Sequence, residues 1–206
     1  MFSVFDKNKT LERSNKWIFG TMLVFGMVGL IAAFVLSIEK LHLLQNSNAV
    51  LSCSFNLVLN CSTVMQTWQA SVFGFPNSYI GLMTYPIVIT VAVVGLAGAT
   101  LPKWFWRTAF VFYGLGAIFA YWLFFNSVYV IEVLCPWCLA VTIGTTIIFG
   151  TIEHFMLREN LLGFSKQAHK KILRFLKADG DRVIIAGWLV LMVALVFIKF
   201  GDSLFM

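Results

Sequence analysis

The tetrapeptide Cys135-Pro136-Trp137-Cys138 opens an apolar run that continues to about residue 155, long enough to cross a membrane. Residues three positions apart share one face of a helix, so these two thiols can form a reversible disulfide. Proline suits the first helical position, where its missing N–H is not needed. Cys135 would then lie at the helix N-terminus, where the helix dipole stabilises a thiolate and lowers the thiol pKa. The stretch therefore predicts redox chemistry at a membrane face, with Cys138 one turn deeper.

The motif taken alone leaves two further roles open, metal binding and an inert place in the core. A CxxC can bind zinc, but zinc needs four suitable ligands; the chain has two further cysteines, and His154 and His169 fall at the far end of this run or beyond it. We therefore expect no metal site. Two cysteines in a helix can also be inert core residues. Attachment of a c-type haem is excluded because Leu139, and not a histidine, follows the second cysteine.

The composition predicts an integral membrane protein. Of the 206 residues, 60% are hydrophobic and only 12% are charged, whereas soluble domains carry about 25% charged residues. The net charge of +6 does not indicate nucleic-acid binding, because the basic residues cluster beside the apolar runs. That distribution is typical of cytoplasmic loops that face anionic lipid.

Five apolar runs have about the length of 20 residues that a helix needs to cross a bilayer. They cover residues 17–38, 79–99, 108–128, 135–155 and 183–200. Residues 100–107 are expected to form a short turn, and the basic segment 156–182 has the apolar spacing of an interfacial helix.

Residues 39–77 form the longest stretch without a span, and they contain Cys53 and Cys61. The segments 56–59 and 64–68 are expected to form short interfacial helices. A long loop in a compact protein is usually functional.

Thirteen of the fifteen Lys and Arg residues lie in three segments, residues 1–16, 100–107 and 156–182. Two spans separate each of these segments from the next, so all three lie on one side, which the positive-inside rule makes cytoplasmic. The exceptions are Lys40 and Lys199. The amino terminus is then cytoplasmic and the carboxyl terminus external. All four cysteines lie at or near the external, oxidising face, which disfavours four inert cysteines.

Three motifs occur in a characteristic order. They are the pair Cys53 and Cys61 continued by Cys61-Ser62-Thr63-Val64-Met65-Gln66-Thr67, then Phe73-Gly74-Phe75-Pro76-Asn77-Ser78-Tyr79-Ile80-Gly81, and then Leu134-Cys135-Pro136-Trp137-Cys138. Together they resemble the vitamin K epoxide reductase family, particularly its bacterial members, over about residues 15–155.

The resemblance implies an all-α membrane fold, in which a four-helix transmembrane bundle surrounds a quinone and an external cysteine-bearing loop caps the bundle. We divide the chain accordingly. Residues 1–155 form the catalytic domain, residues 156–182 a cytoplasmic linker, and residues 183–206 a fifth transmembrane helix with a short external tail.

The resemblance also implies roles for the cysteines. A reduced thioredoxin-fold partner attacks the Cys53–Cys61 disulfide at Cys53, and Cys61 passes the electrons to Cys135 of the Cys135–Cys138 disulfide. Cys138 faces the quinone, either ubiquinone or menaquinone. The expected function is disulfide formation in exported proteins at a bacterial inner membrane. The partner is expected to be a separate, DsbA-like protein, since the sequence has no thioredoxin-like domain after its fifth span.

Four further positions have expected roles. Asn77 matches a position that hydrogen-bonds the quinone, although Asn also suits the N-cap of the second span. Thr67 stands where the family often has Ser and is a second quinone-site candidate. Thr142 replaces a Tyr of the vertebrate enzymes, which argues against vertebrate-type substrate and anticoagulant binding. Glu132, one turn before Cys135, is either a proton-handling group or a solvated residue at the membrane edge.

Two alternative functions remain. A DsbB-type quinone reductase has similar chemistry, but it places its CxxC before its widely spaced pair, which is the reverse of the order here. A non-catalytic membrane subunit would use the cysteines as structural disulfides, which resist reduction more strongly than catalytic ones.

Overall fold

A computed structural model of the protein describes residues 2–46 and 51–201, with side chains from residue 15 onward. Five of its helices are long and apolar enough to cross a membrane. They are α1 (Phe2–Gln45), α3 (Ser78–Leu96), α4 (Lys103–Asn126), α5 (Pro136–Arg158) and α7 (Gly180–Phe200). This architecture confirms the predicted all-α membrane fold.

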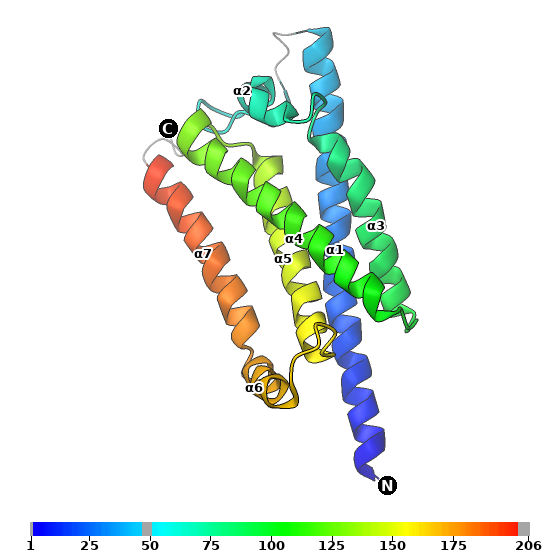
Figure 1. Ribbon diagram of the computed structural model, residues 1–206. Coiled ribbons are helices and arrows are strands. Elements are labelled where there is room, and N and C mark those ends of the chain that lie inside the picture. The colour runs from blue at the N-terminus through cyan, green and yellow to red at the C-terminus, as the bar shows by residue number, and fades with distance from the viewer. Residues whose placement is uncertain (1, 47–50, 202–206) are drawn as a thin grey trace.

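Helix α1 packs against both α3 and α5, and α5 in turn packs against α4 (Figure 1). The approach of α1 to α3 depends on glycine. A Cβ added to Gly29 would lie 2.3 Å from the ring of Tyr85, and one added to Gly95 would lie 2.6 Å from the ring of Phe19. Small residues at such positions let two membrane helices come into close contact.

The bundle core is densely aromatic in the half that lies away from the cysteines. The rings of Phe19, Trp106 and Phe155, from three different helices, have centroids 4.7–5.9 Å apart. Aromatic pairs at this separation are stabilising beyond the area that they bury. This cluster fixes one end of the bundle, whereas the opposite end is closed by the cysteine-bearing loop.

The short helix α2 (Cys61–Gln66), the start of α5 and the end of α7 lie together at one end of the molecule (Figure 1). The amino terminus and the basic helix α6 (Lys166–Lys177) lie at the other end. The cysteines and the main basic segments therefore lie at opposite ends of the bundle, as the charge pattern predicts. Which end faces the cytoplasm stays a prediction.

Helix α1 continues to Gln45, about two turns beyond the predicted end at residue 38. Residues 39–45 contain no proline or glycine that would stop the helix, and Leu43 is buried. The extension carries Glu39 and Lys40 alongside the cysteine-bearing loop.

Two further predictions, near α4 and in the loop, also differ from the structure. Residues 103–107 are helical and not a turn, because Pro102 occupies the N-cap and α4 begins directly after it. Residues 56–59 form a turn and not a helix. The predicted segment 64–68 is largely helical, since residues 64–66 belong to α2 and Trp68 begins the single turn η1 (Trp68–Ser71).

The basic segment 156–182 is not one helix. Helix α5 extends to Arg158, and the backbone then reverses through Asn160 and Gly163, which have φ of 50° and 85°. Asp179, with φ of 52°, makes a second reversal between α6 and α7. Left-handed residues end helices in this way, so the amphipathic helix is limited to residues 166–177.

We predict that reporter fusions will place residue 170 in the cytoplasm and both residue 50 and the carboxyl terminus outside. The reason is the uneven distribution of Lys and Arg between the two ends. Alkaline phosphatase and green fluorescent protein fusions measure this. A cytoplasmic signal from residue 50 would contradict the assignment.

Candidate functional site

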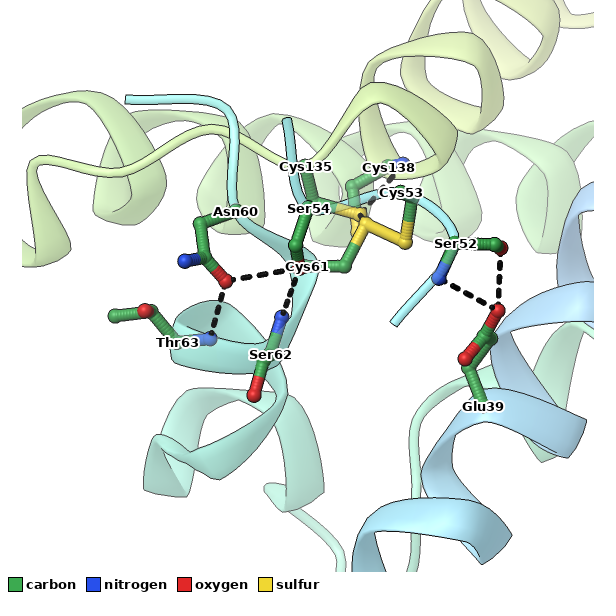
Figure 2. Close-up of a disulfide and its surroundings, with 10 residues drawn as sticks. All are labelled: Glu39, Ser52, Cys53, Ser54, Asn60, Cys61, Ser62, Thr63, Cys135 and Cys138. Atoms are coloured by element: carbon green, nitrogen blue, oxygen red, sulfur yellow. Dashed lines mark hydrogen bonds between the residues drawn. A yellow bond between two sulfur atoms is a disulfide. The ribbon is translucent and has the colours of Figure 1, made fainter. Parts of the chain in front are cut away.

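A tight turn brings the two loop cysteines together. Ser54 and Asn60 form an antiparallel bridge, and the Asn56 side chain closes the turn by accepting hydrogen bonds from the N–H groups of Val58 and Leu59 at 3.0 and 2.7 Å. Because Cys53 and Cys61 flank the bridge, their Cα atoms lie 5.6 Å apart and the sulfurs form a disulfide (Figure 2). This separation is typical of disulfides.

Helix α2 begins at the second cysteine. Asn60 is its N-cap, and its side-chain oxygen accepts a hydrogen bond from the Thr63 N–H at 3.2 Å (Figure 2). Ser54 Oγ donates to the same oxygen at 3.0 Å. An N-cap of this kind satisfies a helix N–H group that would otherwise lack a partner. It also ties the helix start to the turn that carries the disulfide.

The loop is paired with the chain segment that leads into the CxxC. Leu59 and Leu134 form a parallel bridge, in which the Leu134 N–H donates to the Val58 carbonyl at 2.7 Å and the Asn60 N–H donates to the Leu134 carbonyl at 2.9 Å. Cys135 directly follows Leu134, and Cys61 directly follows Asn60. The pairing therefore sets Cys61 and Cys135 side by side, with 3.2 Å between their sulfurs.

The CxxC occupies the start of α5 as predicted. Cys135 is the N-cap, Pro136 is the first helical residue, and the Cys138 N–H donates to the Cys135 sulfur at 3.4 Å. A hydrogen bond from the Cys138 side chain lowers the pKa of the Cys135 thiol, and the N–H groups of Cys138 and Trp137 add to this effect. Burial opposes the shift but does not reverse it. Cys135 is thus suited to act as an attacking thiolate.

The exchanging sulfurs are shielded from solvent. Cys61, Cys135 and Cys53 are exposed by only 0%, 1% and 2%. They form an apolar cluster with residues of α1, α2 and the loop, which include Leu36, Leu43, Leu51, Val64 and Met65. Two free thiols, Cys135 and Cys138, therefore lie against a buried disulfide.

Two polar contacts from α1 hold the loop over this cluster. The carboxylate of Glu39, itself buried, accepts hydrogen bonds from both the N–H and the hydroxyl of Ser52 (Figure 2). The ammonium of Lys40 donates to the Met65 carbonyl at 2.6 Å. No pattern in the sequence singles out Glu39, and Lys40 stands out there only as an exception in the charge distribution.

A cavity of about 620 Å³ extends below the cysteines between α1, α3, α4 and α5. Its lining is mainly apolar, and it includes Cys138, Asn77 and Thr67. It lies between α3 and α4, which among the described residues pack less extensively against each other than α1 does against α3 and α5, or α4 against α5. The volume of the cavity and its apolar lining are typical of a site for an apolar small molecule. The residues that line it therefore fit a quinone.

The two predicted quinone-site residues both line the cavity, but they already have protein partners. The Asn77 amide donates to the Gln69 carbonyl at 2.7 Å and accepts from the Val72 N–H at 3.3 Å. Asn77 is the N-cap residue of α3, as the alternative prediction has it, but its side chain makes no capping hydrogen bond to the helix. The Thr67 hydroxyl donates to the Val64 carbonyl at 2.8 Å.

Several polar groups of the cavity were not predicted from the sequence. The hydroxyls of Tyr85 and Thr145 hydrogen-bond at 3.0 Å, and both residues line the cavity. The buried Tyr113 hydroxyl also lies there and has no hydrogen-bond partner among the described residues. The only signal for these residues is a polar atom within an apolar span, which is costly and often functional in a membrane.

A comparison with models of protein families matches residues 21–152 to the vitamin K epoxide reductase family. The chain belongs to this family. The resemblance of the motifs is therefore confirmed, and so is the oxidoreductase class that the family indicates. Members of the vitamin K epoxide reductase family use quinones and generally work with thioredoxin-like partners. A comparison with curated proteins gave no match.

We predict that the Cys53→Ala/Cys138→Ala variant accumulates a Cys61–Cys135 disulfide when it is oxidised with diamide. The two remaining sulfurs lie 3.2 Å apart and have no other cysteine in the chain. Peptide mass mapping without reduction detects the cross-link. Free thiols, or a cross-link only between two molecules, would contradict the described docking of the loop.

We also predict that Cys138→Ala raises the pKa of Cys135. The Cys138 side-chain hydrogen bond is the largest cause that lowers this pKa, so its loss moves the pKa toward the value of about 8.5 of an ordinary thiol. The thiolate absorbance at 240 nm measures the shift in a Cys53→Ala/Cys61→Ala background, with and without Cys138→Ala. Identical titration midpoints would show that Cys138 does not stabilise the thiolate.

Proposed function

We propose that the protein is a quinone-dependent thiol-disulfide oxidoreductase, which oxidises a separate exported thioredoxin-fold protein and so supports disulfide formation. The single observation that carries this proposal is a continuous path through the site. The loop disulfide contacts Cys135 at 3.2 Å, and Cys138 of the same helical turn lines the apolar cavity.

The exchange steps use only the four cysteines and the partner. A partner thiolate attacks Cys53 and releases Cys61, and the second partner thiol then frees Cys53 and completes the partner disulfide. Cys61 attacks Cys135 of the Cys135–Cys138 disulfide, and Cys53 next attacks Cys61 and releases Cys135. Each step exchanges one disulfide for another. The described arrangement, with the loop pair joined and both CxxC thiols free, corresponds to the state after this relay.

The cavity residues are suited to bind the electron acceptor. A quinone bound there would accept the two electrons and two protons that the CxxC dithiol gives up. Cys138 lines the cavity as the donor thiol, while Asn77 keeps one amide N–H that has no acceptor among the described residues. An amide N–H is a suitable donor to a quinone carbonyl. We infer that the apolar part of the cavity lining contributed by α3 and α4 accommodates the apolar tail of the quinone.

The burial of the sulfurs supports exchange between specific partners. Thiolates react at sulfurs within about 3–3.5 Å when the geometry is held, and Cys61 and Cys135 lie within this range. A purely structural disulfide does not need a free low-pKa thiol at this distance. The charge distribution supports an orientation with the cysteine end outside, and the resemblance to bacterial members of the family is the reason to propose a bacterial inner membrane location.

The test is the Cys138→Ala variant. We expect it to lose reduction of a short-chain ubiquinone or menaquinone, because the thiol that lines the cavity is gone. The loop pair should still exchange stoichiometrically with a reduced thioredoxin-fold protein, measured by trapping the mixed disulfide. Thr151→Ala, also on α5 but outside the cavity lining, is a control that should keep turnover. Steady quinone reduction by Cys138→Ala would refute the proposal.

A further inference from the structure

Helix α7 lies outside residues 21–152, the part of the chain that matches the family. Its carboxyl end nevertheless reaches the end of the bundle that carries the cysteines (Figure 1). There the Lys199 ammonium contacts the Glu132 carboxylate at 2.5 Å. Glu132, a candidate for proton handling from sequence, is thus an ion-pair partner of the fifth membrane helix.

Glu132 lies at a sharp bend just before the CxxC. It follows the π-helical turn η2 (Ser127–Ile131), and its φ of 58° is unusual for a residue other than glycine, asparagine or aspartate. The Ser127 hydroxyl and carbonyl both bond to the backbone of Val133. The bend therefore sets the direction of residues 133–135, which pair with the loop.

The end of α7 also packs under the paired segments. Met192 and Phe200, exposed by 5% and 6%, form one apolar cluster with Val58, Val128 and Leu134. Val58 and Leu134 are partners in the backbone pairing that sets Cys61 against Cys135. The same helix thus contacts this pairing through a buried apolar surface and the preceding bend through an ion pair.

We propose that Met192, Lys199 and Phe200 of α7 act as a clamp, which holds the loop and residues 132–134 in the register that places Cys61 against Cys135. These are positioning residues, and the proposal rests on the thiol exchange proposed above. The two parts of the clamp differ in strength. Lys199 and Glu132 are 36% and 58% exposed, and exposed ion pairs stabilise weakly, whereas the buried Phe200 contributes more.

The test uses the Cys138→Ala variant of the full chain, purified without added oxidant. In this variant, the Cys135 thiolate can attack Cys61: the Cys61–Cys135 bond forms, the Cys53–Cys61 bond breaks, and Cys53 leaves as a thiolate and takes up a proton. No electrons are gained or lost. Without Cys138 no Cys135–Cys138 disulfide can form, and attack of Cys53 on Cys61 is the reverse step, so the two disulfides equilibrate. Acid quenching, alkylation and mass mapping then give the ratio of Cys61–Cys135 to Cys53–Cys61 species.

The Cys61–Cys135 species needs the docked loop, whereas the Cys53–Cys61 species is local to the turn. We therefore expect Phe200→Ala to lower the ratio at least about tenfold, and Lys199→Gln to lower it about two- to fivefold. Lys199→Arg should keep the ratio. The charge-reversed pair Glu132→Lys/Lys199→Glu should restore most of what Lys199→Glu alone loses.

Two controls are matched on the same helix. Phe197→Ala removes the same side chain at a position that is 51% exposed, and Arg182→Gln removes the ion pair with Asp179 at the opposite end of α7. Neither should change the ratio. Lys199→Gln changes only a partly exposed side chain, so we expect this variant to fold. It therefore tests the clamp even if Phe200→Ala does not fold.

The outcomes separate the two proposals. If the Cys138→Ala parent forms no Cys61–Cys135 species, the relay itself is wrong, and the clamp with it. If the parent forms this species but Phe200→Ala and Lys199→Gln leave the ratio unchanged, the relay stands and the clamp is wrong. Equal losses in Phe197→Ala and Phe200→Ala would also refute the clamp, because the effect would then be general to α7.

Discussion

The backbone pairing of the loop with Leu134 is the constraint on which the redox site depends. Two hydrogen bonds, at 2.7 and 2.9 Å, join Leu134 to Val58 and Asn60. Cys135 directly follows Leu134 and Cys61 directly follows Asn60, so the pairing carries the two sulfurs to 3.2 Å without any specific side-chain contact. The N-cap of α2 and the N-cap of α5 then orient the cysteines from either side. Each of these interactions would lose its effect on the exchange if the pairing were displaced by one residue.

The features that could be predicted from the sequence are those that a short motif or a long run of similar residues indicates. Long apolar runs identify spans because a bilayer requires them, and Pro136 after Cys135 identifies a helix start. The pairing of Leu59 with Leu134 has no such signal, since backbone hydrogen bonds do not depend on side-chain type. The predicted end of α1 is wrong because a helix can continue beyond the membrane boundary. The predicted start of α4 is wrong because its aromatic and charged first residues do not prevent a helix. Asn77 lines the cavity, and its predicted bond to a quinone stays a prediction, while its bonds to the loop depend on tertiary contacts that have no sequence signal.

The two exceptions in the charge pattern, Lys40 and Lys199, have related roles. Both lie at the cysteine end, opposite the main basic segments. Lys40 binds the Met65 carbonyl at the end of α2, and Lys199 binds Glu132 before the CxxC. Each lysine therefore contacts one of the two segments that must meet for exchange. In a membrane protein a basic residue on the disfavoured side weakens the orientation signal, so a residue that departs from the pattern is a good candidate for a specific contact.

The proposed exchange makes opposing demands on the loop. Transfer between Cys61 and Cys135 requires close, buried sulfurs, whereas a partner protein needs access to Cys53, which is 2% exposed. The two arms of the loop are held differently. The Cys61 arm is fixed by the pairing with Leu134 and by α2, while the Cys53 arm is held to α1 by the Glu39–Ser52 contacts. The turn between them exposes Phe55 and Leu57 by 70% and 91%. The disulfide and the Ser54–Asn60 bridge join the Cys53 arm to the Cys61 arm. A partner would therefore reach Cys53 by displacing Ser52 from Glu39, a change that leaves the pairing with Leu134 in place.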